Sequence, residues 1–116
     1  MSNDPLRPHH DHKTLKFPDN FLWGSATSAL QVEGNAKDSD WWEWEQKAQP
    51  ESFRSGQAAN QYNLYEADFT LAKSLGHNAH RLSLEWSRIE PREGEFDPSE
   101  IEHYKQVLKS LKDKNM

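Results

Sequence analysis

The chain has 116 residues, a net charge of -5 at pH 7 and a hydrophobic fraction of 34%. A complete (β/α)₈ barrel needs about 250 residues, so none fits in this length. The acidic balance, without a basic stripe, argues against nucleic-acid binding, and no apolar run approaches the ~20 residues needed to cross a bilayer. The chain has no cysteine, which excludes disulfides and thiolate metal sites. Because the N-terminus has no secretory signal, we expect a cytoplasmic protein that binds neither membranes nor nucleic acid.

The first half of the chain is predicted to be a tail, a strand and a long connection. Residues 1–16 are polar and contain prolines, which predicts a flexible tail. This interpretation is favoured over a weak metal site at the histidines of the tail, His9, His10 and His12. Residues 21–26 are a short apolar run after turn-forming residues, which predicts a buried strand. Residues 27–57 are polar and aromatic, and irregular segments of this length are usually functional.

Residues 58–75 have the periodicity of a helix. Aromatic and apolar residues recur at helical spacing, and three leucines are expected to widen the same apolar face. The first group is Tyr62, Tyr65, Phe69 and Ala72, and the leucines are Leu64, Leu71 and Leu75. Gly76 then supplies the left-handed position that commonly ends a helix.

Residues 79–86 alternate with a period of two, which predicts a second strand. One face carries His80, Leu82, Leu84 and Trp86, and the other carries Ala79, Arg81, Ser83 and Glu85. A second helix is predicted to begin at Asp97, because Asp97 suits the N-cap, Pro98 the first helical position and Glu100 the third. Apolar residues continue at helical spacing to about residue 111, so the last residue, Met116, is expected inside this helix or just after it.

The predicted order is strand, long loop, helix, strand, loop, helix. Two consecutive βα units imply parallel strands joined by a right-handed crossover. Periodicity alone does not distinguish an open doubly wound sheet from a segment of a barrel. The first strand continues into Thr27 and Ser28 without the glycine spacing of a dinucleotide-binding loop.

Two groups of residues in this plan could carry chemistry. If the second strand belongs to a barrel, Arg81 and Glu85 point inward, where charges must be paired or solvated. They could pair with other barrel residues or with each other, or they could line a polar well, and the residues alone leave these alternatives even. After the first strand, Gln31 and Glu33 precede a cluster of tryptophans, Trp41, Trp42 and Trp44. The indoles could bind sugar faces, or they could pack the loop onto the rim.

Several motifs together resemble glycoside hydrolase family 1. Residues 21–34 (FLWGSATSALQVEG) resemble the N-terminal signature of the family, and residues 40–45 (DWWEWE) resemble the Trp-rich stretch that often follows it. Residues 78–91 (NAHRLSLEWSRIEP) resemble its second strand, with the Trp-Ser-Arg-Ile-x-Pro ending intact. Residues 62–75 and 97–111 are similar to its first two helices. The likeness covers about residues 17–116.

The resemblance implies an α/β fold, namely the N-terminal part of a (β/α)₈ TIM barrel that is incomplete here. It also implies hydrolysis of β-linked glycosides with retention of configuration, without a cofactor or a metal. Gln31 matches the glutamine that hydrogen-bonds sugar hydroxyls in the cleaved subsite. Arg81 matches the arginine that lies beside the nucleophile and holds it ionised. Glu33 matches the glutamate of the signature, for which we expect a structural role, and Glu85 inherits no catalytic role.

Neither catalytic carboxylate of the family is expected in this chain. The acid/base belongs to an Asn-Glu-Pro motif and the nucleophile to a Glu-Asn-Gly motif, and neither motif occurs here. Both glutamates are therefore expected to lie beyond Met116. Asn60 is a smaller departure, because the family more often has Asp there.

We therefore expect an inactive N-terminal portion of a β-glycosidase, truncated or split from the remainder. The alternatives are a non-catalytic carbohydrate-binding module and a structural half that assembles with a separately encoded C-terminal piece.

Overall fold

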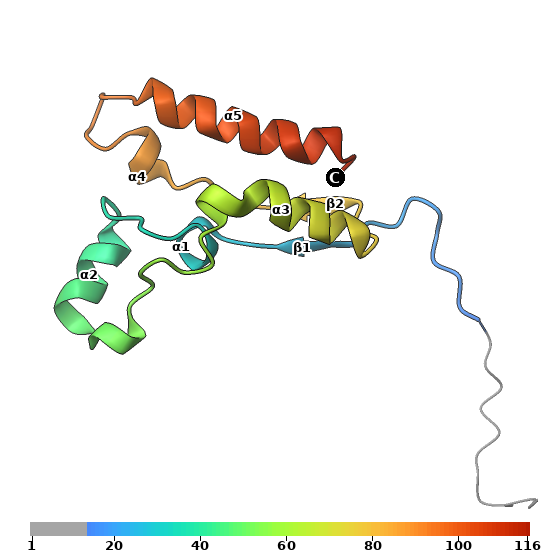
Figure 1. The fold of residues 1–116 in the computed structure, drawn as a ribbon, viewed down its shortest axis with the longest axis horizontal. Helices are drawn as coiled ribbons and strands as arrows, with labels where there is room; N and C mark the ends of the chain where they lie inside the picture. The colour runs from blue at the N-terminus through green and yellow to red at the C-terminus, as the bar shows by residue number, and fades with distance from the viewer. Residues whose placement is uncertain (1–13) are drawn as a thin grey trace, which may run out of the picture.

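The computed structural model describes residues 14–116. Most of the expected tail, including its three histidines, lies outside this range. The described part is a two-stranded sheet with helices (Figure 1). The elements in chain order are β1 (Gly24–Ala26), α1 (Ala29–Val32), α2 (Asp40–Ala48), the 3₁₀ turn η1 (Glu51–Phe53), α3 (Gln61–Ser74), β2 (Ala79–Arg81), α4 (Trp86–Ile89) and α5 (Pro98–Asp113).

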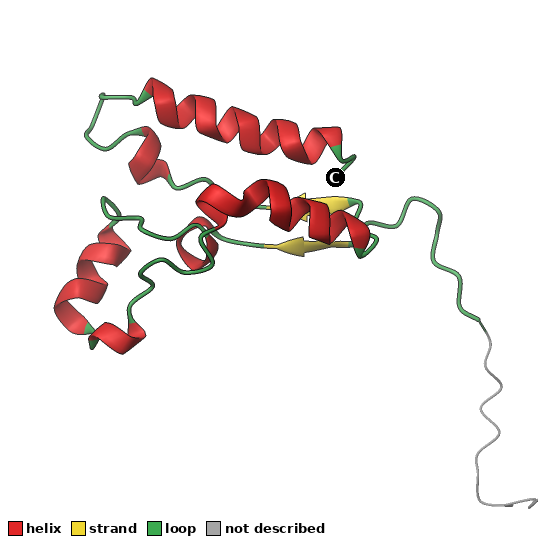
Figure 2. Cartoon of the chain, viewed as in Figure 1, coloured by secondary structure: helices red, strands yellow, loops and turns green. Residues whose placement is uncertain are grey.

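The two strands are parallel, and α3 is the helix of the crossover between them, as the sequence predicts. Gly24 pairs with Ala79 and Ala26 with Arg81. The pairing requires glycine at position 24, because a Cβ there would lie 2.2 Å from the Ala79 carbonyl oxygen. Both strands are shorter than predicted. Contrary to the buried strand expected at residues 21–26, all three residues of β1 are exposed, and within residues 14–116 the sheet consists of β1 and β2 alone (Figure 2).

Helices α3 and α5 enclose the hydrophobic core above the sheet. Phe69 of α3 is 1% exposed and packs with Val107 and Leu111 of α5. Leu82 packs against this cluster from the segment after β2, and the His80 ring lies 5.1 Å from the Phe69 ring. The face predicted to carry His80, Leu82, Leu84 and Trp86 therefore meets the core only at His80 and Leu82. Leu84 and Trp86 lie beyond β2 and are 38% and 57% exposed, so the prediction is wrong for them.

Met116 follows α5, as expected, and belongs to the edge of the same core. Helix α5 ends at Asp113, and the Met116 N–H donates to the Leu111 carbonyl at 3.0 Å. This hydrogen bond turns the chain back, so that Met116 packs against the cluster of Phe69, Val107 and Leu111.

The three leucines expected on the buried face of α3 lie elsewhere. Leu64, Leu71 and Leu75 are 47%, 61% and 72% exposed. The reason is helical geometry: at 3.6 residues per turn, Leu71 is about 200° around the axis from Phe69. The prediction of one broad apolar face is therefore wrong, and α3 has a second apolar stripe on its outer side.

The prediction that residues 27–57 are irregular is wrong. This segment contains α1, α2 and η1. The α2 helix begins where the Ser39 side chain accepts a hydrogen bond from the Trp42 N–H at 3.1 Å. Its C-terminal end is closed by Arg54, which donates to the carbonyls of Gln49 at 3.0 Å and Gln46 at 3.1 Å. The polar composition that predicts a loop is here the capping chemistry of short helices.

The second predicted strand ends early, at Arg81, and Trp86 begins helix α4. Glu85 is the N-cap of this helix, and its carboxylate accepts hydrogen bonds from the N–H and the hydroxyl of Ser87. The predicted start of the last helix is confirmed. Asp97 is the N-cap of α5, Pro98 occupies its first turn, and the Asp97 carboxylate accepts from the Ser99 N–H at 2.8 Å.

Candidate functional site

Both strands end at the same edge of the sheet, and the residues that follow them define the candidate site. Ala26 and Arg81, the last residues of β1 and β2, are paired. The Thr27 N–H donates to the Arg81 carbonyl at 2.9 Å and continues this pairing. Gln31 lies in α1, toward which both strand arrows point in Figure 1. The structure thus places Gln31 and Arg81, both exposed, at the edge expected from the sequence, and their roles stay predictions.

A buried ion pair holds the segment that carries Gln31. Arg88 of α4 donates from Nε to the Glu33 carboxylate at 3.1 Å and from Nη2 to the Gly34 carbonyl at 2.5 Å. The side chains of Arg88 and Glu33 are 15% and 9% exposed. Tyr104 of α5 donates its hydroxyl to the same carboxylate at 2.9 Å. These contacts confirm the structural role expected for Glu33.

The same network reaches the segment after β2. The Tyr104 hydroxyl accepts the Glu85 N–H at 3.0 Å, and the Ala29 N–H donates to Ser83 Oγ at 2.8 Å. The chain after β1 is therefore tied to the chain after β2 on both sides of Gln31. Gln31 and Arg81 are thus held on one connected framework.

Burial dominates the electrostatics of this ion pair. Desolvation raises the pKa of Glu33, and the hydrogen bond from Tyr104 and the charge of Arg88 oppose this rise. Burial and the neighbouring Glu33 carboxylate raise the pKa of Tyr104, so its hydroxyl stays protonated and able to donate at neutral pH. The carboxylate of Glu33 is occupied by these partners and is not available to a substrate.

Tyr62 extends the network toward α5. The Arg88 guanidinium carbon lies 4.4 Å from the centroid of the Tyr62 ring, and the His103 ring stacks on it at 3.9 Å. The Tyr62 hydroxyl donates to Glu100 at 3.0 Å. Burial is the larger cause and the hydrogen bond to Glu100 the next, and together they raise the pKa of Tyr62 to about 12. Burial also lowers the pKa of His103. The imidazole therefore serves as a neutral packing partner at pH 7.

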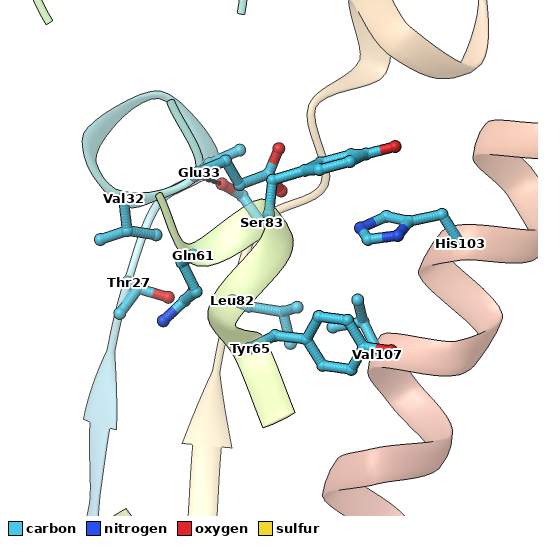
Figure 3. Close-up of a pocket in the computed structure, with 11 residues that line it drawn as sticks. Thr27, Val32, Glu33, Gln61, Tyr65, Leu82, Ser83, His103 and Val107 are labelled. Atoms are coloured by element: carbon cyan, nitrogen blue, oxygen red, sulfur yellow. Dashed lines mark hydrogen bonds between the residues drawn. The ribbon is translucent and has the colours of Figure 1, made fainter. Parts of the chain in front are cut away.

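The enclosed gap beside this network is too small for a sugar. Figure 3 shows it between Thr27, Gln61, Leu82 and Val107, with Glu33 and His103 at its sides. Its volume is about 10 Å³, which is room for one water molecule. This gap therefore does not hold a ligand of glycoside size.

The possible ion pair between Arg81 and Glu85 is absent, and the sequence did not indicate the basic partner of Glu33. Arg81 and Glu85 form no ion pair among residues 14–116, because Glu85 caps α4 instead. Arg88, the partner of Glu33, was not singled out in the sequence. A buried carboxylate requires a counter-charge, but one sequence does not indicate which of the chain's basic residues supplies it.

The tryptophans of α2 were expected either to bind sugar faces or to pack the loop onto the rim, and they differ in exposure. Trp42 is half-buried, which fits packing. Trp41 and Trp44 are 52% and 46% exposed, with ring centroids 5.0 Å apart. The Trp41 indole N–H donates to Glu45 at 3.2 Å, and Glu45 accepts the Ser55 hydroxyl at 2.7 Å. The Trp41 ring is therefore held in an accessible position.

Within residues 14–116, no group of three or more His, Asp or Glu side chains could hold a metal ion. None of the helices in that range has both the length and the apolar character needed to cross a membrane.

The order and the parallel pairing of these elements are those of the first two βα units of a barrel. The glycosyl hydrolase family 1 model matches residues 13–116. The chain is 35% identical to β-glucosidase 14 of Arabidopsis thaliana over 130 aligned positions, covering 99% of the chain and 27% of the relative. It is 40% identical to a β-galactosidase of Pyrococcus woesei, covering 65% of the chain and 17% of the relative.

A solved structure agrees with this assignment. The β-glycosidase from Pyrococcus horikoshii is 43% identical and superposes with a TM-score of 0.80, covering 88% of the chain and 24% of that structure. The chain belongs to glycosyl hydrolase family 1. The incomplete-barrel fold predicted from the resemblance is confirmed. The chain spans only 17–27% of the length of these relatives.

Proposed function

We propose that residues 17–116 are the N-terminal portion of the barrel of a retaining β-glycosidase. In this proposal Gln31 hydrogen-bonds hydroxyls of the sugar in the cleaved subsite, and Arg81 keeps a neighbouring carboxylate nucleophile ionised. The observation that carries the proposal is the alignment of the two strand ends. It brings an amide and a guanidinium to one exposed edge, where barrel active sites lie.

Hydrolysis with retention of configuration needs two carboxyl groups, which limits what residues 17–116 can do alone. A carboxylic acid must protonate the leaving oxygen, and a carboxylate about 5–5.5 Å away must attack the anomeric carbon. Glu33 is enclosed by Arg88 and Tyr104, and Glu85 caps α4. Neither is free to act as acid or nucleophile.

We therefore propose that the 116 residues contribute substrate contacts and no catalytic carboxylate. Catalysis then requires a further polypeptide segment that supplies the acid/base and the nucleophile. The position of these two glutamates beyond Met116 stays a prediction.

The source of that segment separates the alternatives. Sequencing the coding DNA downstream of the Met116 codon tests whether Asn-Glu-Pro and Glu-Asn-Gly motifs follow in the same frame or in a second one. Motifs in the same frame favour a single enzyme, and motifs in a second frame favour a separately encoded C-terminal half. Absence of both motifs contradicts the enzyme proposal. The cytoplasmic location stays a prediction, for which cell fractionation is the test.

The residue roles are tested in a complemented enzyme. The chain is co-expressed with the part of the P. horikoshii β-glycosidase that follows the matched region, and turnover of p-nitrophenyl β-glucoside is measured. We expect Gln31→Ala and Arg81→Met to lower kcat/KM by at least about a hundredfold, the scale of losing a transition-state contact. Arg92→Met is the control, because Arg92 is an exposed arginine in a surface pair with Glu95. Equal effects of Arg81→Met and Arg92→Met would contradict the role of Arg81.

A non-catalytic binding module is the second candidate. It is favoured by the accessible indoles of Trp41 and Trp44. Titration of the 116-residue chain with cellobiose, followed by tryptophan fluorescence, measures this directly. Binding that is lost in Trp44→Ala, together with no turnover in the complemented enzyme, would favour the module over the enzyme.

A further inference from the structure

The outer face of α3 carries a shallow groove that the proposed function does not use. It is lined by seven residues of this helix: Asn63, Leu64, Glu66, Ala67, Thr70, Leu71 and Ser74. The groove lies on the side of the helix away from Phe69, so it faces neither the sheet nor the core. In a closed barrel the outer face of a ring helix is also free, because the helix packs on its strands with its opposite side. The groove therefore needs an explanation that does not depend on completing the barrel.

The residues of the groove repeat with the spacing of a helix-pairing seam. Leu64 and Leu71 are seven residues apart, and Ala67 and Ser74 follow each of them by three. This is the a/d pattern of coiled-coil packing, with large and small side chains alternating along the seam. Leu64 and Leu71 are 47% and 61% exposed, which is unfavourable for a stripe of apolar side chains in water.

The two hydroxyls and the carboxylate along the seam already have partners. The Thr70 hydroxyl donates to the Glu66 carbonyl at 2.7 Å and the Ser74 hydroxyl to the Leu71 carbonyl at 2.7 Å, both within α3. Glu66 is the only charged residue of the groove, and its carboxylate is engaged by Ser110 of α5 and by Lys114, which follows that helix. An apolar partner can thus cover the groove without leaving these groups unpaired.

The order of large and small residues makes the seam complementary to itself when reversed. If a second α3 lies antiparallel, Leu64 faces Ser74 of the other copy and Leu71 faces its Ala67. The twofold symmetry repeats both pairings, so each of the four layers places a leucine against a small side chain. Small residues allow close approach of the two helix axes, and layers of constant summed volume pack without voids. A parallel arrangement would instead place leucine against leucine and small against small.

We infer that the α3 groove is a self-association surface, in which two copies of the chain pair through antiparallel α3 helices about a twofold axis near residue 69. Such an interface is isologous and closes at two copies. It does not involve the edge that carries Gln31 and Arg81, and it does not rest on the proposed function.

The first test measures dimerisation of the 116-residue chain by sedimentation velocity over a concentration series. Leu71→Ala opens cavities in two layers, and Ala67→Leu places leucine against leucine in the same layers. Each single change is expected to raise the dimer dissociation constant by at least about tenfold. The double variant Ala67→Leu/Leu71→Ala restores one large and one small residue per layer, and it is expected to recover the affinity. Both positions are exposed and accept good helix formers, and circular dichroism checks that the helix content is unchanged.

The control variant is Leu108→Ala, which removes the same atoms from a leucine of α5 that is 48% exposed and lies outside the groove. Its dissociation constant is expected to equal that of the unchanged chain. A monomer at every concentration would overturn the inference. Association that is insensitive to the α3 changes, or single losses that the double variant does not recover, would overturn it equally.

A cross-linking experiment tests the antiparallel geometry itself. The chain has no cysteine, so a single introduced thiol reports one contact. Thr70→Cys lies beside the expected twofold axis, and a short bis-maleimide is expected to convert this variant to a covalent dimer. Gln106→Cys, on the exposed side of α5, is the matched control and is expected to remain monomeric on a denaturing gel. Equal cross-linking of the two variants would contradict pairing through α3.

Discussion

Arg88 is the side chain on which the connection between the two βα units depends most. It is the counter-ion of a carboxylate that is 9% exposed, and it also holds the Gly34 carbonyl. Removing one partner of a buried pair leaves an uncompensated charge, which costs about 3–5 kcal/mol. We predict that Arg88→Met loosens residues 27–57 and speeds their proteolysis by at least about a hundredfold.

The control for Arg88→Met is Arg92→Met. Arg92 and Glu95 form a surface pair with side chains 80% and 64% exposed, and such pairs contribute about 0–1 kcal/mol. Limited proteolysis followed by mass spectrometry measures both variants at the same bonds. Equal cleavage rates would show that the buried pair does not hold the segment. A partial recovery in Glu33→Gln/Arg88→Met is expected, because that double change removes the unpaired charge.

Gly34 is the second residue that fixes this segment. It has a φ of +84°, and a Cβ at this position would lie 2.0 Å from the Gln57 carbonyl oxygen. We predict that Gly34→Ala separates the start of the segment from its end, and that it exposes Gln57 and its neighbours to protease. Gly94→Ala is the matched control, since Gly94 has a φ of +78° and nothing within 4 Å. If both substitutions act equally, backbone strain and not the close approach explains the effect.

At the scale of elements, α5 begins at an N-cap whose charge can be titrated. Hydrogen bonds from the Ser99 hydroxyl and N–H hold the pKa of Asp97 below its ordinary value of 3.8. A lowered pKa means that the folded chain favours the ionised form. The cap therefore stabilises α5 above the unfolded pKa, and this contribution is lost as the pH falls through the lower folded value.

The measurement is a pH titration followed by NMR. We predict that the Asp97 carboxyl carbon titrates with a midpoint below 3.8, and that the Ser99 amide shifts in the same step. In Asp97→Asn the Ser99 amide is expected to show no such step, because the amide cap has no charge to lose. A midpoint at or above 3.8 would contradict the capping geometry.

The elements that sequence predicts well are those with a local chemical signal. The start of α5 is predicted from the capping chemistry of Asp97, Pro98 and Glu100. In the structure Asp97 is the N-cap and Pro98 is the first residue of the helix, as predicted. Alternation at residues 79–86 predicts β2 but not its end at Arg81. A period of two reveals neither this end nor the Glu85 cap that begins α4 at Trp86.

The misplaced leucines of α3 show a different limit of sequence. Three leucines at helical spacing predict an apolar stripe, but a stripe does not state whether it meets the core. Leu71 lies opposite Phe69, so α3 has two apolar faces, of which only one is buried in this chain. The position of Gln31 and Arg81 at one edge followed from the order of βα units. The Glu33–Arg88 contact, across 55 positions of the chain, required the fold.

At the scale of the whole molecule, the chain has few of the contacts that stabilise a barrel. Its two strands have three residues each, and two-stranded sheets are marginal alone. Among residues 14–116 the buried hydrophobic residues are Ala29, Ala36, Phe69, Ile89, Tyr104, Val107 and Leu111. Large apolar side chains beside β1 stay exposed, including Trp23 at 47% and Phe21 at 39%.

The last prediction follows from this balance: the isolated 116 residues do not hydrolyse aryl β-glucosides and unfold without a sharp cooperative transition. Catalysis fails because Glu33 and Glu85 are engaged elsewhere and nothing places them on opposite sides of one anomeric carbon. Cooperativity fails because the sheet has two free edges and one uncovered face. The measurements are p-nitrophenyl β-glucoside turnover and thermal unfolding by circular dichroism. A sharp transition would contradict the stability prediction. Turnover that is lost in Glu33→Gln or Glu85→Gln would contradict the catalytic one, because it would assign a catalytic carboxylate to this chain.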